Sequence, residues 1–110
     1  MKKLYRIRKN EEFSRIIKER HSIANAGFVV YYSPSRMENA RVGISVSKKL
    51  GDAVTRNLIK RQVREMARAL IDFENYKKDF IIIVRSSFLN KNYQENLLDL
   101  EKILKKAIIE

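Results

Sequence analysis

The segment between positions 48 and 68 contains the residues best suited to bind a charged ligand. It holds seven lysines and arginines against two acids. If residues 53–71 form a helix that advances about 100° per residue, one flank of it gathers the following side chains: Asn57, Lys60, Arg61, Arg64 and Arg68. Arginine offers a planar fork of donors that suits phosphate oxygens and base edges, and lysine adds a compact positive charge. The pattern predicts a polyanion-binding flank.

The other residues of this helix support that interpretation. Ile59, Val63 and Met66 form an apolar stripe beside the basic flank, Arg56 lies at its edge, and Lys48 and Lys49 come just before it. The alternative is an unusually basic face that is simply solvated. A solvated helix normally mixes charge signs at i and i+4, whereas Glu65 is the single acid within residues 53–71. Phosphate binding is therefore the better interpretation.

The charge of the whole chain agrees with a nucleic-acid partner. Its formal net charge is +11, and residues 1–20 hold eight lysines and arginines against three acids. Such an excess favours nucleic acid first and an anionic membrane surface second. No segment approaches the roughly 20 apolar residues of a membrane span, and charge returns too early for a signal peptide, at Arg6, Arg8 and Lys9. We expect a soluble cytoplasmic protein.

A second candidate surface is aromatic and apolar. Phe13 and Ile17 are one helical turn apart, and Tyr31 alternates with Phe28 and Val30 along a strand. If the first helix packs beside the sheet, Phe13, Ile17 and Tyr31 can line a groove for single-stranded RNA, whose bases stack on aromatic rings. The alternative is that Phe13 and Ile17 are ordinary core residues.

The sequence offers no catalytic or metal-binding set. It has no cysteine, and His21 is its sole histidine, expected at the surface near a strand end. Asp72, Glu74 and Asp79 are expected as solvated residues in a loop between helix and strand. An independent nuclease would need metal-binding carboxylates or a histidine–acid pair. We therefore predict no catalytic residue, no bound metal and no cofactor in this chain.

The elements that must position these residues follow from periodicity. We expect a helix at 10–20 with Asn10 as its N-cap, strands at 21–25, 28–32, 41–47 and 80–84, and helices at 53–71 and 93–108. The short link at 34–40 predicts an antiparallel hairpin between the second and third strands. The third strand alternates, so one of its faces is expected to stay open.

These elements predict an α+β fold in one domain, residues 1–110. It is a two-layer sandwich of a four-stranded mixed sheet and three helices, in the order α-β-β-β-α-β-α. A helix-turn-helix is excluded because a strand, and not a helix, precedes residues 53–71. The common RNA-binding sheet is not indicated either, since its Lys/Arg-Gly-aromatic signature is missing.

Residues 45–65, SVSKKLGDAVTRNLIKRQVRE, closely resemble the hallmark of the bacterial ribonuclease P protein subunit. That family shows a strand ending in Ser-x-x-Lys-Lys, a turn, and a helix with Arg-Asn-x-x-Lys-Arg-x-x-Arg. The resemblance extends to Arg8-Lys9-Asn10-x-x-Phe13, to the Phe28-Val29-Val30-Tyr31 strand and to the strand from Asp79 to Arg85. It covers essentially the whole chain and is weakest in the last helix.

The resemblance implies a function in tRNA maturation. In this family the RNA subunit is the catalyst and, with Mg²⁺, removes the 5′ leader of precursor tRNA by hydrolysing one phosphodiester bond. The protein binds the catalytic RNA and the precursor, and binds no cofactor itself. Carried over by position, the RNA-binding residues would be Lys48, Lys49, Arg56, Asn57, Lys60, Arg61 and Arg64. Arg68 extends this set beyond the family motif.

Two further implications concern the groove and the fold. Phe13, Ile17 and Tyr31 would hold the single-stranded leader, although many relatives place an aromatic residue where this chain has Ile17, which cannot stack on a base. The family fold, of the ribosomal-protein-S5-domain-2-like kind, has a left-handed crossover through the central helix, whereas general rules predict a right-handed one. We expect the protein alone to be a monomer.

The competing hypothesis is a basic ribosomal-type RNA-binding protein without a role in tRNA processing. It explains the charge and the fold equally well. It predicts no particular sequence on the helix at 53–71, however, and so leaves the family motif unexplained.

Overall fold

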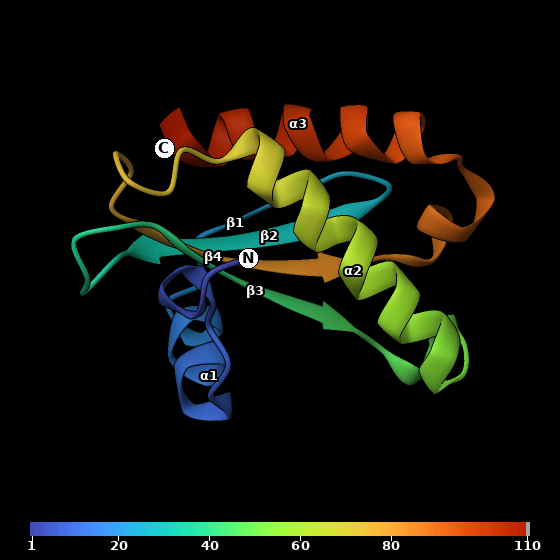
Figure 1. Ribbon diagram of the computed structural model, residues 1–110, viewed down its shortest axis with the longest axis horizontal. Coiled ribbons are helices and arrows are strands. Elements are labelled where there is room, and N and C mark those ends of the chain that lie inside the picture. The colour runs from blue at the N-terminus through green and yellow to red at the C-terminus, as the bar shows by residue number, and fades with distance from the viewer. Residues whose placement is uncertain (110) are drawn as a thin grey trace.

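The structure is a computed structural model that describes residues 1–109 (Figure 1); Glu110, the last residue of the predicted domain, lies outside it. The α-helices are α1 (Asn10–Lys18), α2 (Ala53–Leu70) and α3 (Tyr93–Ile109). The strands are β1 (Ser22–Ala24), β2 (Phe28–Pro34), β3 (Arg41–Val46) and β4 (Lys78–Val84). The α+β class and the predicted element order are confirmed.

The four strands form one mixed sheet in the order β1-β2-β4-β3. β4 pairs antiparallel with β2 and parallel with β3. The predicted hairpin between β2 and β3 is therefore wrong, because β4 lies between them. β4 is apolar on both faces, with Phe80, Ile81 and Ile82 fully buried, and such a strand is stabilised most in the middle of a sheet. β3 is left at the outer edge.

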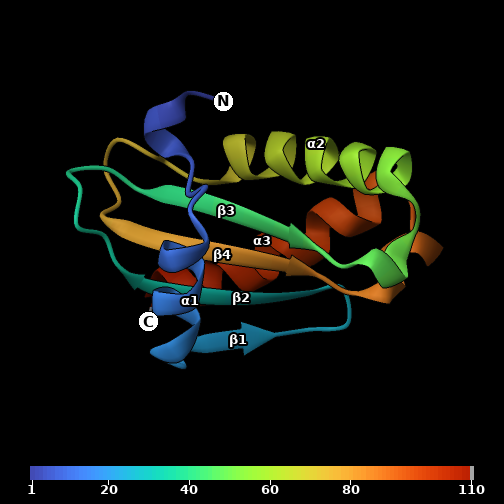
Figure 2. The same ribbon diagram turned by 90° about the horizontal axis from the view of Figure 1, so that it is seen from below.

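The connection from β3 through α2 to β4 is left-handed, as the family resemblance implied. In Figure 2 the parallel strands β3 and β4 point the same way, α1 lies in front of the sheet, α3 lies behind it, and α2 runs beside β3. α2 packs with α3 against the face opposite to α1. The general right-handed preference does not hold here.

Two apolar clusters fix the layers. The larger one joins α2 and α3 to one face of the sheet, with Val63, Met66 and Leu100 at zero exposure. The smaller one contains Ile7, Ile16 and Ile81 and fastens α1 to the opposite face. α1 and α2 therefore stand on opposite faces of the sheet and both lie near β3.

Local signals explain where the helices begin. Asp52 is the N-cap of α2, and its carboxylate accepts a hydrogen bond from the Thr55 backbone N–H at 2.8 Å, which lowers the pKa of Asp52. The N-cap predicted for α1 is off by one residue. Lys9 holds that position without a side-chain bond, and Asn10 is already helical.

α1 covers the face of β3 that was predicted to be open. Arg41 and Gly43 on that face are both buried. A Cβ atom on Gly43 would lie 2.6 Å from Cζ of Phe13, so the absence of a side chain there is what allows α1 to approach the strand. The open-face prediction is wrong for these two residues, because sequence alternation does not reveal a helix that packs from a distant segment. It holds further along the predicted strand, where Ser45 is half-buried and Ser47 is exposed.

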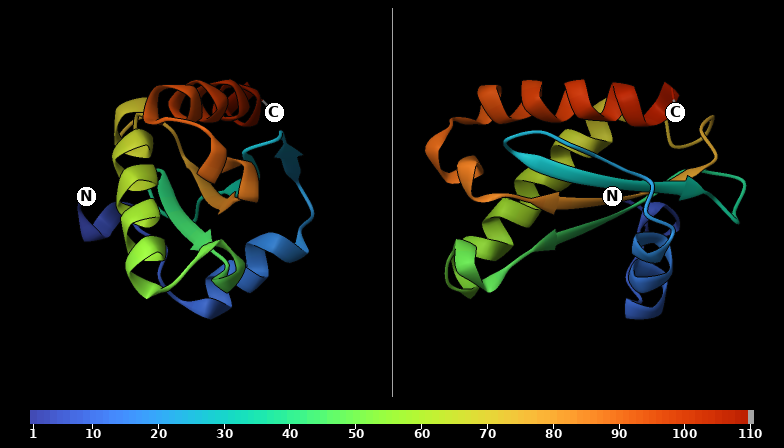
Figure 3. Two further views of the ribbon diagram at one scale, coloured as in Figure 1. Left: turned by 90° about the vertical axis from the view of Figure 1, so that its right-hand side faces the viewer. Right: turned by 180° about the vertical axis from the view of Figure 1, so that it is seen from behind.

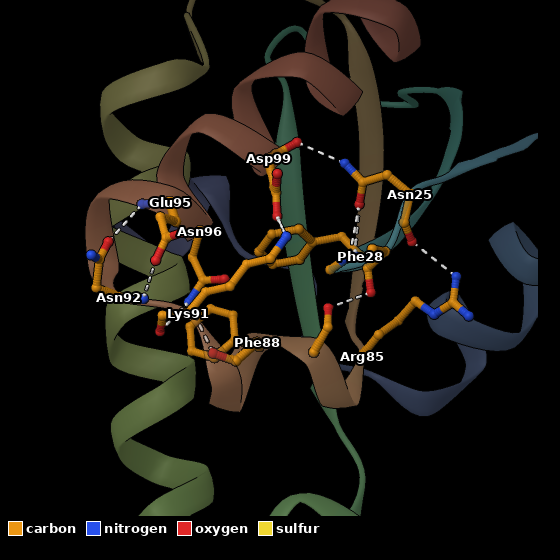
Figure 4. Close-up of polar contacts among 12 residues, drawn as sticks. Asn25, Phe28, Arg85, Phe88, Lys91, Asn92, Glu95, Asn96 and Asp99 are labelled. Carbon is orange, nitrogen blue, oxygen red and sulfur yellow. Dashed lines mark hydrogen bonds and ion pairs between the residues drawn. The ribbon is translucent and has the colours of Figure 1, made fainter.

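A polar cluster attaches the start of α3 to the turn between β1 and β2 (Figure 4). The Asn25 side-chain amide donates to the Asp99 carbonyl at 2.9 Å, and the Lys91 ammonium contacts the Asp99 carboxylate at 2.6 Å. Asn92 and Glu95 form a reciprocal cap at the first turn. These contacts hold α3 across the sheet, away from α1.

Candidate RNA-binding site

The basic flank of α2 is open in the folded chain. Lys48, Lys49 and Arg61 are exposed, as are Asn57 and Arg68, while Arg56, Lys60 and Arg64 are half-buried. Within residues 1–109 none of these cations forms an ion pair with a carboxylate. The predicted set therefore lies along α2 and the short 3₁₀ helix Lys48–Leu50 just before it, and within residues 1–109 no carboxylate neutralises its positive charge.

Arg64 experiences this excess of charge most directly. Burial lowers the pKa of Arg64, and the nearby charge of Arg6 lowers it further. The side chain is thus partly withdrawn from water and faces another cation. A bound phosphate would relieve both effects, since it supplies the missing negative charge and the acceptors for the guanidinium N–H groups.

A groove of about 490 Å³ lies between α1 and α2. One wall is formed by Phe13, Ser14 and Ile17 of α1, and the other by Lys60 and Arg64 of α2. The groove also includes Val42, Ile44, Ser45 and Val46 of β3, so it passes along the outer edge of the sheet. The end-on view in Figure 3 shows α1 and α2 on the two sides of this edge. We call this cavity the β3-edge groove.

The fold brings only part of the predicted groove together. Phe13 and Ile17 line the β3-edge groove, beside two cations of α2 that the sequence pattern assigns to a separate surface. Tyr31 does not line it. Its half-buried ring packs instead against the cluster that includes Phe13 and Ile17, so its contribution is to support the α1 wall.

Sequence reasoning missed the N-terminal side of the groove, formed by Met1, Arg6, Ile7 and Arg8. This segment is held in place by an Asn39 side-chain bond to the Leu4 carbonyl at 3.1 Å and by stacking of Tyr5 on Phe73 at 4.7 Å. The positive charge of residues 1–20 was a signal for it. What the sequence could not show was that these cations face those of α2.

Comparison with known proteins now bears on this geometry. The family model described as Ribonuclease P matches residues 1–108. The chain belongs to the ribonuclease P protein family. The ribonuclease P protein component of Streptococcus pyogenes serotype M5 (strain Manfredo) is 41% identical over 107 residues, which covers 97% of this chain and 89% of that protein.

Solved structures of the family share the fold. A Staphylococcus aureus RNase P protein mutant, described as defective in mRNA degradation activity, superimposes with a TM-score of 0.87 at 44% identity, covering 96% of this chain and 89% of the other. The RNase P protein from Thermotoga maritima gives a TM-score of 0.80 at 32% identity, with coverage of 92% and 96%. The resemblance found in the sequence is confirmed, and it favours a ribonuclease P protein over a ribosomal-type one.

In this family member a buried ion network fastens α1 to the sheet. Arg41 donates from Nε and Nη2 to the two carboxylate oxygens of Asp79, at 3.0 and 2.8 Å, and from Nη1 to Glu12 at 2.8 Å. Arg15 lies 3.7 Å from the same Asp79 carboxylate. Hydrogen bonding to Asp79 raises the pKa of Arg41 despite its burial. The network sets where the α1 wall stands.

This network corrects the prediction for Asp79. The sequence pattern placed it in a solvated loop, but it lies in β4 with zero exposure. An ionised carboxylate is tolerated there because Arg41 pairs with both of its oxygens. Asp72 and Glu74 are exposed, as expected.

A second, smaller cavity of about 220 Å³ continues the basic surface of this ribonuclease P protein. It is lined by Met1, Arg61, Arg64, Glu65 and Arg68. Arg64 therefore borders both cavities, and cations extend from the groove to the C-terminal half of α2.

Outside the basic surface, the sequence drew attention to His21 and to the carboxylates of the helix-to-strand segment. Within residues 1–109 no three histidine, aspartate or glutamate side chains gather as a metal site would require. His21 is exposed beside the ring of Tyr32. Among the helices of residues 1–109, none has the length and apolar character needed to cross a membrane.

Proposed function

We propose that this chain is the RNA-binding protein subunit of the ribonuclease P ribonucleoprotein and assists removal of the 5′ leader from precursor tRNA. One observation carries the proposal: the unpaired cations of α2 and the apolar wall of α1 meet in a single groove. Phosphates and bases of a single strand need both kinds of surface at once. A protein that bound only double-stranded RNA would have no use for the α1 wall.

The two parts of the surface take different RNA partners. The basic flank of α2 contacts the ribonuclease P RNA through its phosphates, together with the two lysines before the helix. The residues of this surface are Lys48, Lys49, Arg56, Asn57, Arg61 and Arg68. The β3-edge groove holds the single-stranded leader of the precursor. Lys60 and Arg64 lie where the two surfaces join, so they neutralise phosphates close to the cleavage site.

The chemical step belongs to the RNA subunit in this proposal. The protein contributes positive charge that brings two polyanions together, which lowers the Mg²⁺ concentration needed for their association. In this proposal the Mg²⁺ ions are held by RNA phosphates. The protein works as a monomer before assembly, in the bacterial cytoplasm, where precursor tRNA is made.

The test is cleavage of a precursor tRNA by a bacterial ribonuclease P RNA at low Mg²⁺, with and without this protein. We expect the protein to restore cleavage that the RNA alone does not perform under these conditions. Failure to restore it, with a relative's protein component active in parallel, would reject the proposal.

A further inference from the structure

The floor of the β3-edge groove is the outer edge of a strand. β3 is the last strand of the sheet, so only one of its sides pairs with β4. On the outer side, the Val42 carbonyl accepts a hydrogen bond from the Ile7 backbone N–H at 2.9 Å. Backbone groups two residues apart in a strand point the same way. The N–H and C=O of Ile44 therefore also point outward.

No backbone segment within residues 1–109 pairs with Ile44 on that side. The N-terminal segment makes a single bridge, between Arg6 and Val42, and then turns away into α1 at Asn10. Ile44 lines the groove together with Ser45. The donor and the acceptor of Ile44 thus stand side by side at the floor, next to the covered position Val42.

We propose that the backbone N–H and C=O of Ile44 form a pair of hydrogen bonds with the edge of one leader nucleobase. This inference rests on the proposed function. Every standard base presents a donor beside an acceptor on its Watson–Crick edge, for example N3–H and O4 of uracil. A backbone pair therefore binds any base and discriminates against none, which suits a protein that must accept leaders of different sequence.

The surroundings fit a nucleotide better than a peptide strand. The cations Arg6, Lys60 and Arg64 face the groove and would hold the phosphates on either side of the bound base. The free edge is also short, because the bridge at Val42 closes one end and a 3₁₀ helix begins at Lys48. A peptide that extends a sheet needs a longer row of backbone groups.

The protein-side test is Ile44→Pro compared with Ile44→Ala. Proline removes the N–H and is tolerated at an edge position whose N–H faces outward, while alanine removes most of the side chain and keeps the N–H. The measurement is the ratio of affinities of the holoenzyme for precursor tRNA with a leader and without one. We expect Ile44→Pro to reduce this ratio by about three- to tenfold beyond Ile44→Ala. Equal ratios for the two variants would overturn the inference. Equal ratios are also the result expected if the free edge of β3 binds a peptide strand and not the leader.

An RNA-side test keeps the inference falsifiable if Ile44→Pro does not fold. The wild-type holoenzyme is given leaders made of uridine in which one position at a time is N3-methyluridine, which lacks the N3–H donor. We expect the holoenzyme to bind the precursor more weakly when one particular leader position is methylated, and no weaker when any other is. The RNA subunit alone is expected to show no such loss of affinity. A uniform small loss at every position would overturn the inference. If unmodified leaders give the wild type no gain over leaderless tRNA, the proposed leader groove itself fails.

Discussion

Arg64 is the residue at which the two parts of the basic surface meet. It lines both cavities, has no acid partner within residues 1–109, and lies close enough to Arg6 for that charge to lower its pKa. Its neighbour Ile17, across the groove, is the other decisive residue. In the proposed function, Arg64 would supply charge for a phosphate and Ile17 would supply apolar surface for a base.

Arg64→Ala is expected to weaken binding of the ribonuclease P RNA at any leader length. Loss of one phosphate contact also reduces the slope of log affinity against log salt by about one unit. Titrations at several salt concentrations measure both quantities. Lys102→Ala, an exposed cation of α3, is the control; an equal effect from it would show that only total charge matters.

Ile17→Phe is expected to tighten binding of precursor tRNA that carries a leader. The side chain is half-buried and lines the groove, and a ring there could stack on a base, an interaction worth about 1–3 kcal/mol. A misfolded variant would bind the precursor more weakly, so tighter binding cannot be explained by damage to the fold. Affinity is compared with that of Ile17→Leu, which adds no ring; no difference between them would contradict the stacking role.

At the scale of elements, the position of α1 decides whether a groove exists. α1 has nine residues, and only Ile16 among them is fully buried, so its apolar contact with the sheet is modest. Glu12 and Arg15 add charged contacts to the Arg41–Asp79 pair. Gly43 completes the arrangement by leaving room for the ring of Phe13.

Glu12→Gln is therefore expected to loosen α1 while the Arg41–Asp79 pair remains. The loss of a charge-assisted bond at a partly exposed site predicts about 1 kcal/mol of lost stability and a Tm lower by about 5 °C. Leader-dependent affinity falls as well, because the α1 wall is less well fixed. Glu11→Gln removes an exposed neighbour on the same helix; if it lowers leader affinity equally, the network has no positioning role.

At the scale of the whole molecule, a buried charge pair joins two strands of the sheet beneath α1. Asp79 is inaccessible to solvent and joins β4 to the edge strand β3 through Arg41. The same pair connects the sheet to α1 through Glu12. The stability of the fold and the position of the α1 wall consequently depend on the same ion pair.

Asp79→Asn is expected to destabilise the whole domain, because it leaves Arg41 buried without its counter-charge. Breaking a buried pair from one side typically costs about 3–5 kcal/mol. Urea unfolding gives the free energy, and Asp72→Asn, at an exposed position, provides the comparison. A difference below about 1 kcal/mol between the two variants would mean that Arg41 finds another partner or water.

Much of this protein follows from sequence alone, for a physical reason. The helices, the strands and the basic flank of α2 depend on periodicity and on local charge, which act between residues close in the chain. The apolar stripe of Ile59, Val63 and Met66 is of this kind. The family motif around Arg56 and Lys60 is also local, because its residues are neighbours in the chain and on one helix.

Only the tertiary structure decided what these elements form together. The insertion of β4 between β2 and β3, the burial of Asp79 and the approach of α1 to Gly43 depend on contacts between distant segments, which no local pattern records. The groove arises because two helices on opposite faces of the sheet meet at the free edge of β3. The open backbone of Ile44 results from strand order, since any residue type at position 44 would present the same N–H and C=O, proline excepted.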